Sequence, residues 1–253
     1  MDLVPVSTNP DSIKARKGNR KHKLVVASSP TRSNKATRSN PQDVQALTSN
    51  MVENIRWTQG FDYPDMVRIA VPGDGHCFFH ALCLSFSREY KTGVIDGRAI
   101  DRQTFVINLR RDLAKLLTDK VDPLDRESLT YYEQLSRGSL KEFGDNVPEY
   151  KLSNMIRELQ SSQSVDYVYY ELISDQIDKD IYVLNLITQD VYVMGDASEL
   201  YIKNRDSVVL LYMPGHYELI GLVDEDRIKT LFPYDHPFIT AIRTRIREVS
   251  PQE

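Results

Sequence analysis

Cysteine is scarce in this chain of 253 residues, which contains only Cys77 and Cys83. Two cysteines are too few for a disulfide framework or for a zinc site built from cysteine alone. No apolar run approaches the roughly 18 residues that a membrane-spanning helix needs, and the first residues lack the basic-then-apolar order of a signal peptide. We therefore expect a protein with no membrane partner that works inside the cell, in the cytoplasm with the nucleus as a second compartment.

The composition excludes a collagen-like or wholly disordered chain, because 41% of the residues are apolar and 27% are charged. The length allows one substantial domain, or two small ones, with an appendage. The net charge of −4 is distributed unevenly. Residues 1–40 hold nine Lys or Arg and two Asp, a net charge of +7, which leaves −11 on the remainder. A basic tail thus precedes an acidic body.

The basic tail shows neither helical nor strand periodicity, so we predict a disordered leader over residues 1–44. Its Lys and Arg residues, between residues 14 and 38, fit a nuclear-import signal, a phosphate-binding patch or merely a solvated tail. The tail has no aromatic residue on which a base could stack, which argues against recognition of single strands. Nucleic acid is therefore a partner only through this leader, if at all.

Apolar periodicity in the body changes from helical to extended. Between Cys77 and Phe86 apolar residues occur all around the helical wheel, which predicts a helix buried in the domain centre. An apolar stripe predicts a helix over 102–118, with Arg110 on its outer face. Further predicted elements are helices at 128–143, 149–161, 164–178 and 236–249, and strands at 67–71, 181–187, 191–194, 208–213 and 217–223. We expect an α+β domain over 45–225, with a small, mostly antiparallel central sheet flanked by helices, and a C-terminal extension over 226–253 containing one helix.

Cys77 is the residue with the strongest chemical signal. It directly follows a Gly-Asp-Gly turn and begins a predicted helix, where free backbone N–H groups stabilise an anion and lower a thiol pKa. Gly73 and Gly75 allow backbone N–H groups of residues 74–77 to converge on a developing oxyanion. These features suit a nucleophile, although a structural cysteine in a buried helix fits as well. Cys83 lacks them and is expected to be structural.

A possible partner for Cys77 lies far along the chain. His216 follows a Pro-Gly turn between two predicted strands, exposed as a general base must be. Glu218 is two residues further on and therefore points to the same side of the strand. A carboxylate there could orient the imidazole.

A metal site is the competing interpretation of the same segment. His76 and His80 would share one face of a helix, with Cys77 between them. A fourth ligand is missing from the segment, so we expect no metal. His80 is then a packed or hydrogen-bonded core residue, and His76 contributes backbone and substrate-side contacts.

Three segments resemble those of one enzyme family. Gly73-Asp-Gly-His-Cys-Phe-Phe-His-Ala-Leu82 resembles the nucleophile motif of the ovarian tumour (OTU) cysteine proteases, in which Asp-Gly-x-Cys opens the central helix. The segment 169–174 followed by 181–184 is similar to the family's helix that leads into a core strand, and 216–220 resembles its histidine strand. The resemblance covers about residues 65–223. A lone domain of this kind with a basic leader is similar to the stand-alone OTU proteins of large DNA viruses.

The resemblance implies a papain-like OTU fold and a cysteine protease domain over 45–225. It implies that Cys77 is the nucleophile, that His216 is the base, and that the loop with Gly75 and His76 supplies the oxyanion hole. The family usually has Asp or Asn where this chain has Glu218, and Asp74 is the motif's own acid, so both are candidates for the third catalytic residue.

The implied activity is that of a deubiquitinase, or ubiquitin thioesterase. It hydrolyses isopeptide, peptide and thioester bonds at the C-terminal glycine of ubiquitin, without a metal or cofactor. Ubiquitin, polyubiquitin chains and ubiquitin-like modifiers are the implied partners. The alternatives are an OTU-like module that binds ubiquitin without turnover, favoured only by Glu218, and a nucleic-acid binder that uses the leader.

Overall fold

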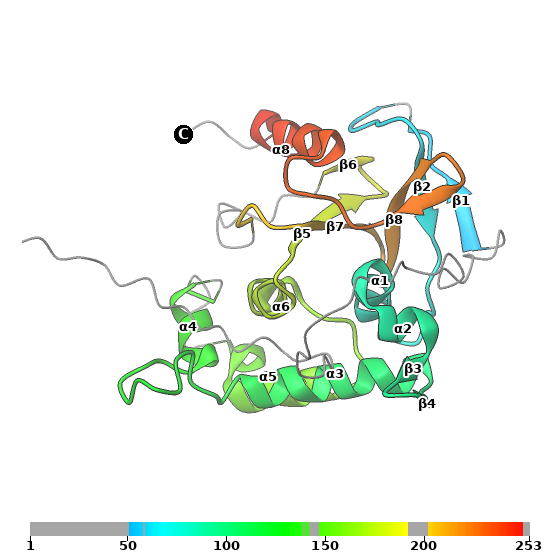
Figure 1. Ribbon diagram of the computed structural model, residues 1–253. Helices are drawn as coiled ribbons and strands as arrows, with labels where there is room; N and C mark the ends of the chain where they lie inside the picture. The colour runs from blue at the N-terminus through cyan, green and yellow to red at the C-terminus, as the bar shows by residue number, and fades with distance from the viewer. Residues whose placement is uncertain (1–50, 58, 139, 142–146, 192–201, 250–253) are drawn as a thin grey trace, which may run out of the picture.

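A mixed sheet runs through the middle of the molecule, and helices cover both of its faces (Figure 1). The computed structural model describes residues 51–57, 59–138, 140–141, 147–191 and 202–249. Within these residues the sheet has seven strands in the order β1-β2-β8-β7-β5-β6, and β9 pairs with the end of β8. The strands are β1 (Val52–Asn54), β2 (Met66–Ile69), β5 (Asp180–Asn185), β6 (Asp190–Val191), β7 (Ser207–Met213), β8 (His216–Asp224) and β9 (Arg227–Lys229).

Most neighbouring strands are antiparallel, as the short connections predict. β5 and β6 form one hairpin, and β7 and β8 form another across Pro214 and Gly215. Gly215 has a φ of 75°, a left-handed conformation that glycine adopts without strain. β5 and β7 are parallel instead, which requires a crossover connection. The predicted α+β class with a mostly antiparallel sheet is confirmed. Of the strand expected at 191–194, only Val191 lies in the described residues.

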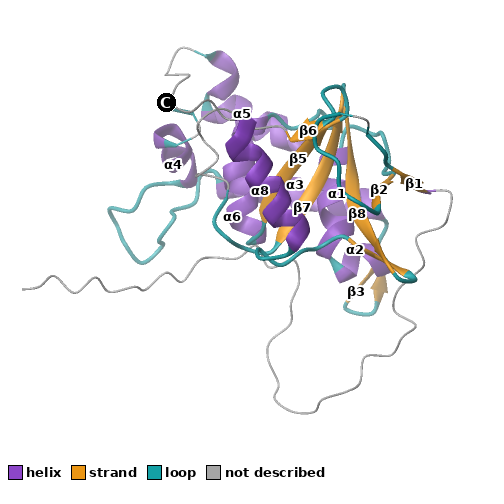
Figure 2. Cartoon of the chain, turned by 90° about the horizontal axis from the view of Figure 1, so that it is seen from above, coloured by secondary structure: helices purple, strands orange, loops and turns teal. Residues whose placement is uncertain are grey.

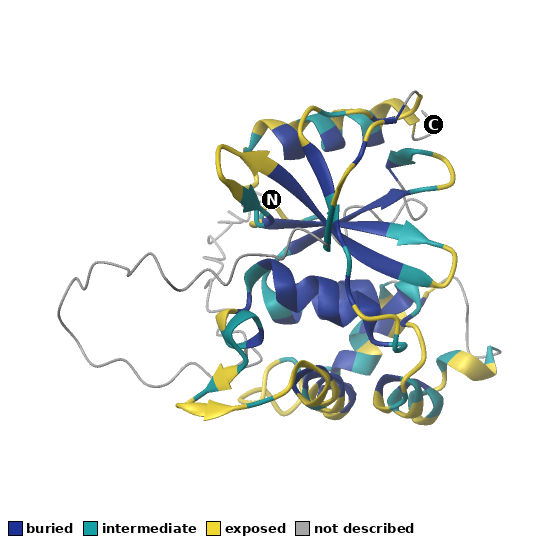
Figure 3. Ribbon diagram, turned by 90° about the vertical axis from the view of Figure 1, so that its right-hand side faces the viewer, coloured by how far each residue is buried: buried dark blue, intermediate teal, exposed yellow. Residues whose placement is uncertain are grey.

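The central strands are buried on both faces, because each alternates its side chains between two apolar clusters. In β7, Val208 and Leu210 pack toward the α1 side, while Val209 and Leu211 pack toward the last helix. β5 and β8 alternate in the same way. The domain is therefore a sandwich of three layers, helix on sheet on helix, as Figure 3 shows by burial.

The helices divide unequally between the two faces. On one side lie α1 (Cys77–Phe86), α2 (Arg88–Thr92), α3 (Arg102–Leu116), α4 (Tyr131–Arg137), α5 (Leu152–Gln160) and α6 (Tyr170–Ile177), with the short helices η4 (Pro148–Tyr150) and η5 (Tyr167–Tyr169) and a small hairpin of β3 (Val94–Ile95) and β4 (Arg98–Ala99). On the other side lies α8 (Pro237–Val249). None of the helices in the described part of the chain combines the length and apolar character that crossing a bilayer requires.

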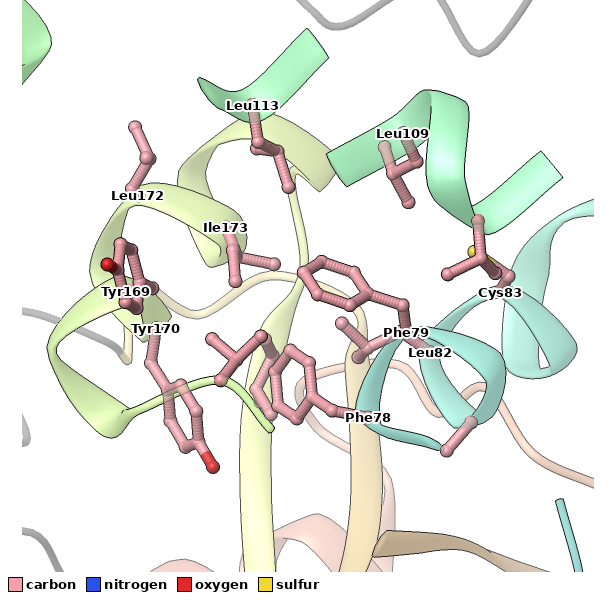
Figure 4. Close-up of a cluster of buried hydrophobic side chains, with 14 of the residues drawn as sticks. Phe78, Phe79, Leu82, Cys83, Leu109, Leu113, Tyr169, Tyr170, Leu172 and Ile173 are labelled. Carbon is pink, nitrogen blue, oxygen red and sulfur yellow. The ribbon is translucent and has the colours of Figure 1, made fainter. Parts of the chain in front are cut away.

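Helix α1 is the centre of the larger helical layer, and its range matches the prediction. All of its residues except Phe86 are buried, since it packs between the sheet and the outer helices. Phe78 and Phe79 point from α1 toward side chains of α3 and α6 (Figure 4). Removing either ring would cost about 3–5 kcal/mol, as for other buried phenylalanines. The nucleophile candidate thus begins a helix that is buried along almost its whole length.

The expected C-terminal helix is confirmed as α8, which covers one face of the sheet. Its residues Phe238, Ile239 and Ile242 are fully buried against the strands. Figure 2 looks down on α8 lying over the strands. The segment expected as an extension, 226–253, also adds β9 to the sheet. The expected leader at 1–44 and the expected start of the domain at residue 45 lie outside the described residues.

Candidate active site

The structure places Cys77 beside the strand that carries His216. Cys77 is the first residue of α1, and its sulfur accepts a hydrogen bond from the backbone N–H of Tyr217 at 3.4 Å. Tyr217 directly follows His216 on β8. This contact brings the candidate nucleophile close to the strand of the candidate base, although the two residues lie far apart in the sequence.

The thiol of Cys77 differs from the expectation in its acidity. Burial, which leaves 2% of the residue exposed, raises the pKa of the thiol above that of an ordinary cysteine. Hydrogen bonds from the backbone N–H groups of Tyr217, Phe78 and Cys77 itself act in the opposite direction. The predicted lowering is therefore wrong for the free protein, because loss of water around the sulfur outweighs the N–H groups of the helix start.

His216 and Glu218 lie on one face of β8, as their spacing predicts. Nε2 of His216 is 4.0 Å from Oε1 of Glu218. The other side of the ring faces the nucleophile loop, since a Cβ on Gly73 would be 3.9 Å from Nδ1 and Cε1 of His216. The imidazole thus stands between the loop before Cys77 and a carboxylate.

Asp74 is turned toward the loop and α1. Its Oδ1 accepts the backbone N–H of His76 at 3.0 Å, and its Oδ2 is 3.1 Å from Nε2 of His80. A carboxylate only accepts, so Nε2 of His80 is the donor in this pair, and Nδ1 of the same ring lies 2.7 Å from the Tyr90 hydroxyl. Burial raises the pKa of Asp74, but the bonds from His76 and His80 outweigh it and leave the pKa below its usual value. His80 is the hydrogen-bonded core residue that the sequence predicts.

The side chain of His76 packs against Arg110 beneath the nucleophile loop. Its ring is buried, and its Nδ1 is 3.2 Å from the guanidinium of Arg110. Burial, followed by the charge of Arg110, lowers the pKa of His76, which favours the neutral imidazole that accepts from an arginine. Its backbone N–H donates to Asp74, so both the ring and the N–H of His76 are engaged within the loop. The ring is part of the loop's support.

Gly75 occupies a position that has no room for a side chain. It has a φ of 82°, and a Cβ there would be 1.6 Å from the carbonyl oxygen of Ser162. The loop after α5 therefore packs directly on the turn before Cys77. Glycine is required both for the left-handed backbone and for this close approach.

Arg110 is the site residue that the sequence does not reveal. The apolar stripe predicts it on the outer face of its helix, yet it is 1% exposed. Its guanidinium reaches the carbonyl oxygens of Gly75, Glu158, Leu159 and Gln163 and the Nδ1 of His76, at 2.9 to 3.3 Å. These five acceptors, and the Phe79 ring 5.0 Å below its carbon, compensate the buried charge. Burial lowers the pKa of Arg110 to about 10, so it remains a cation at neutral pH.

The described residues contain no group of three or more His, Cys, Asp or Glu side chains that is placed to hold a metal ion. The rings of His76 and His80 meet edge to face, 6.3 Å apart. Their nitrogens face Arg110, Tyr90 and Asp74. Both histidines serve the loop's hydrogen bonds.

The candidate site is identified by its chemistry and not by the size of a hollow. A groove of about 700 Å³ lies elsewhere, between α8 and residues 60–62. Neither Cys77 nor His216 lines it.

Comparisons with known proteins give matches only among solved structures. No protein family matches the sequence, and no curated protein does. The chain is similar in fold to an ovarian tumour (OTU) domain in complex with ubiquitin, with 14% identity and a TM-score of 0.42 over 73% of this chain and 85% of that chain. It is also similar to the OTU domain of OTUD1, with 18% identity and a TM-score of 0.35 over 61% and 85% of the two chains.

Proposed function

We propose that this chain is a cysteine hydrolase that cleaves bonds at the C-terminal glycine of ubiquitin. The observation that carries the proposal is the 3.4 Å contact from the Tyr217 N–H to the Cys77 sulfur, which joins the first residue of α1 to the strand that begins at His216. The substrate class rests on the resemblance of residues 73–82 to the OTU nucleophile motif. A general base next to a nucleophilic thiol is the arrangement that acyl transfer through a thioester requires.

The proposed reaction proceeds through a thioester. His216 takes the proton of Cys77, and the thiolate attacks the glycine carbonyl to form a tetrahedral intermediate. Collapse breaks the C–N bond, and the proton held by His216 passes to the departing lysine amine. Water, deprotonated by His216, then attacks the thioester, which releases the ubiquitin carboxylate and returns the proton to the thiol.

Glu218 stabilises the charge that His216 gains. Because burial raises the pKa of the Cys77 thiol, its thiolate needs an adjacent cation. A protonated His216 provides that cation, and Glu218 lies on its far side. Asp74 is assigned to the loop instead, since its two oxygens face His76 and His80.

The oxyanion is assigned to backbone N–H groups of the nucleophile loop. The N–H of His76 is engaged by Asp74, so the role falls to its neighbours Gly75 and Cys77. Arg110 fixes the loop by binding the carbonyl of Gly75 and the ring of His76. Donors that are fixed before the reaction stabilise a developing charge without reorganising.

The test is covalent capture. Ubiquitin with an electrophilic C-terminus is incubated with the wild type, Cys77→Ala and the matched control Cys83→Ala, and the adduct is mapped by mass spectrometry. We expect an adduct on Cys77 in the wild type and in Cys83→Ala. An adduct on Cys83, or undiminished labelling of Cys77→Ala, would refute the assignment. Diubiquitins of each linkage then define the substrate.

Two properties of Cys77 favour the second candidate, a module that binds ubiquitin without turnover. Cys77 is nearly inaccessible and its thiol pKa is raised, both of which disfavour reaction. That function would give saturable ubiquitin binding by calorimetry, together with no adduct and no cleavage. Binding with an adduct on Cys77 would exclude it.

A further inference from the structure

Strand register gathers charged residues around Glu218 on one face of the sheet. Arg68 of β2 pairs with Ile220 of β8 and with Glu53 of β1. Directly paired residues share a face, and Glu218 precedes Ile220 by two positions. His216 precedes it by four. A line from Glu53 through Arg68 and Glu218 to His216 therefore crosses three strands on a single face.

The contacts follow this line. Nε of Arg68 donates to Oε2 of Glu53 at 3.0 Å. Nη1 of Arg68 is 3.7 Å from Oε2 of Glu218 and 3.8 Å from the sulfur of Met213. Met213 is the register partner of His216. The guanidinium thus reaches over β8 into the neighbourhood of the imidazole.

Glu218 is the group that this arrangement explains. Its side chain is 9% exposed, and its Oε2 is buried without a hydrogen bond among the described residues. Oε1 lies 4.0 Å from Nε2 of His216. The carboxylate therefore stands between the imidazole and one guanidinium. A buried carboxylate without a nearby cation takes up a proton instead of carrying charge.

We propose that Arg68 is a positioning residue, whose guanidinium balances the buried carboxylate of Glu218 and keeps it aimed at His216. The inference rests on the proposed function of His216 as the base. Among the described residues, the charged groups around Glu218 are His216 on its own strand and Arg68 on β2, with Glu53 behind Arg68. Its partner on β7, Leu211, carries no charge. Arg68 acts through Glu218, which alone adjoins the imidazole.

Two readouts test this role. The first is the pH dependence of the alkylation of Cys77 by iodoacetamide, which is monitored by mass spectrometry. The buried Cys83 serves as the internal reference for a thiol that stays protected in the folded protein. The second is kcat/KM for a fluorogenic C-terminal amide of ubiquitin over the same pH range. The variants are Arg68→Gln, Arg68→Lys and, as the matched control, Arg98→Gln on the exposed hairpin of β3 and β4. All are compared at the same folded fraction.

We expect the acidic limb of both profiles to move up by about 1 pH unit in Arg68→Gln, because Glu218 then protonates more readily. At low pH this is a roughly tenfold loss of rate. Arg68→Lys should restore most of the wild-type profile, and Arg98→Gln should not move it. In a Glu218→Gln background, Arg68→Gln should add nothing, as for two residues that act as a unit.

Other results overturn the inference. The role of Arg68 is refuted if the acidic limb of the pH profiles does not move in Arg68→Gln. It is also refuted if the effects of Arg68→Gln and Glu218→Gln on the rate are fully additive. Absence of Cys77 alkylation at every pH removes the ion pair on which the role depends. If Arg68→Gln does not fold, the single variant Glu53→Gln decides, because the guanidinium of Arg68 then loses its anchor on β1 and the acidic limb should shift in the same direction. Alkylation needs no ubiquitin, so a shifted alkylation profile without ubiquitin cleavage would refute the proposed substrate and leave this inference standing.

Discussion

The backbone N–H of Tyr217 and the sulfur of Cys77 are 3.4 Å apart, although 140 positions of sequence separate them. This contact joins the start of the buried helix to the start of a central strand. Everything proposed for the site depends on it, because it sets the position of His216 relative to the thiol. The residues around it fall into two groups, the imidazole with its carboxylate and the supports of the loop.

Neutralising Glu218 tests the first group. Glu218→Gln should lower kcat/KM by about 10²–10⁴, the scale seen when a triad acid is neutralised, whereas Glu218→Asp should be milder. Asp74→Asn at matched stability is the comparison, and it should retain more activity because Asp74 faces His76 and His80. A loss of less than about threefold in Glu218→Gln, which is ~0.65 kcal/mol of barrier, would remove Glu218 from the catalytic set.

The lowered pKa of Asp74 predicts a pH dependence of stability. A carboxyl group with a lower pKa in the folded state stabilises the fold above its unfolded pKa, about 3.9, and loses that contribution as the pH falls through the folded pKa. The difference in unfolding free energy between the wild type and Asp74→Asn should therefore shrink from pH 5 toward pH 2 in denaturant titrations. A difference that grows toward low pH would contradict the network with His76 and His80.

Arg110 and its neighbour Arg111 form a matched pair for stability. Arg110→Met should destabilise the fold by about 3 kcal/mol, because the carbonyl oxygens of Gly75, Leu159 and Gln163 then lose the donor that the guanidinium supplies. Arg111→Met changes an exposed residue of the same helix and should stay within about 0.5 kcal/mol of the wild type. Equal effects in denaturant titrations would show that the guanidinium of Arg110 is not the anchor of the loop.

Alanine variants of two glycines with similar φ angles distinguish backbone strain from a steric clash of the added Cβ. Gly97 has a φ of 76° with open space around it, and Gly75 has a φ of 82° with the Ser162 carbonyl in the way. Gly97→Ala should cost about 1–2 kcal/mol and preserve activity. Gly75→Ala should cost more and abolish labelling of Cys77, since the turn must move. Similar Tm and labelling in the two variants would contradict the close packing at Gly75.

Local pattern predicts the elements well. The helix at Cys77–Phe86 has its expected bounds, because apolar residues surround the whole wheel and a glycine turn precedes it. The strand alternation after residue 180 and the short turn at Gly215 likewise predict the hairpin of β7 and β8. His216 and Glu218 share a face for the same local reason.

What the sequence does not predict is set by distant contacts. Arg110 is buried because four carbonyls converge on it, from the turn before Cys77, from the last turn of α5 and from the loop after α5, and no spacing in the chain encodes that. The direction of the Cys77 pKa shift depends on how completely the surrounding layers exclude water. The parallel pairing of β5 and β7 depends on a crossover connection, which periodicity does not describe.

The pairing of β2 with β8 has a consequence for the order of folding. Residues 66–69 lie just before the nucleophile loop, and their partners 219–222 are synthesised much later. Contacts between such distant segments form slowly, because a long loop must close before any pairing stabilises it. During refolding, helical signal should therefore return before reactivity of Cys77. A nascent or partly folded chain would carry an intact cysteine without the proposed hydrolase activity, so the appearance of that activity would report the pairing of β2 with β8.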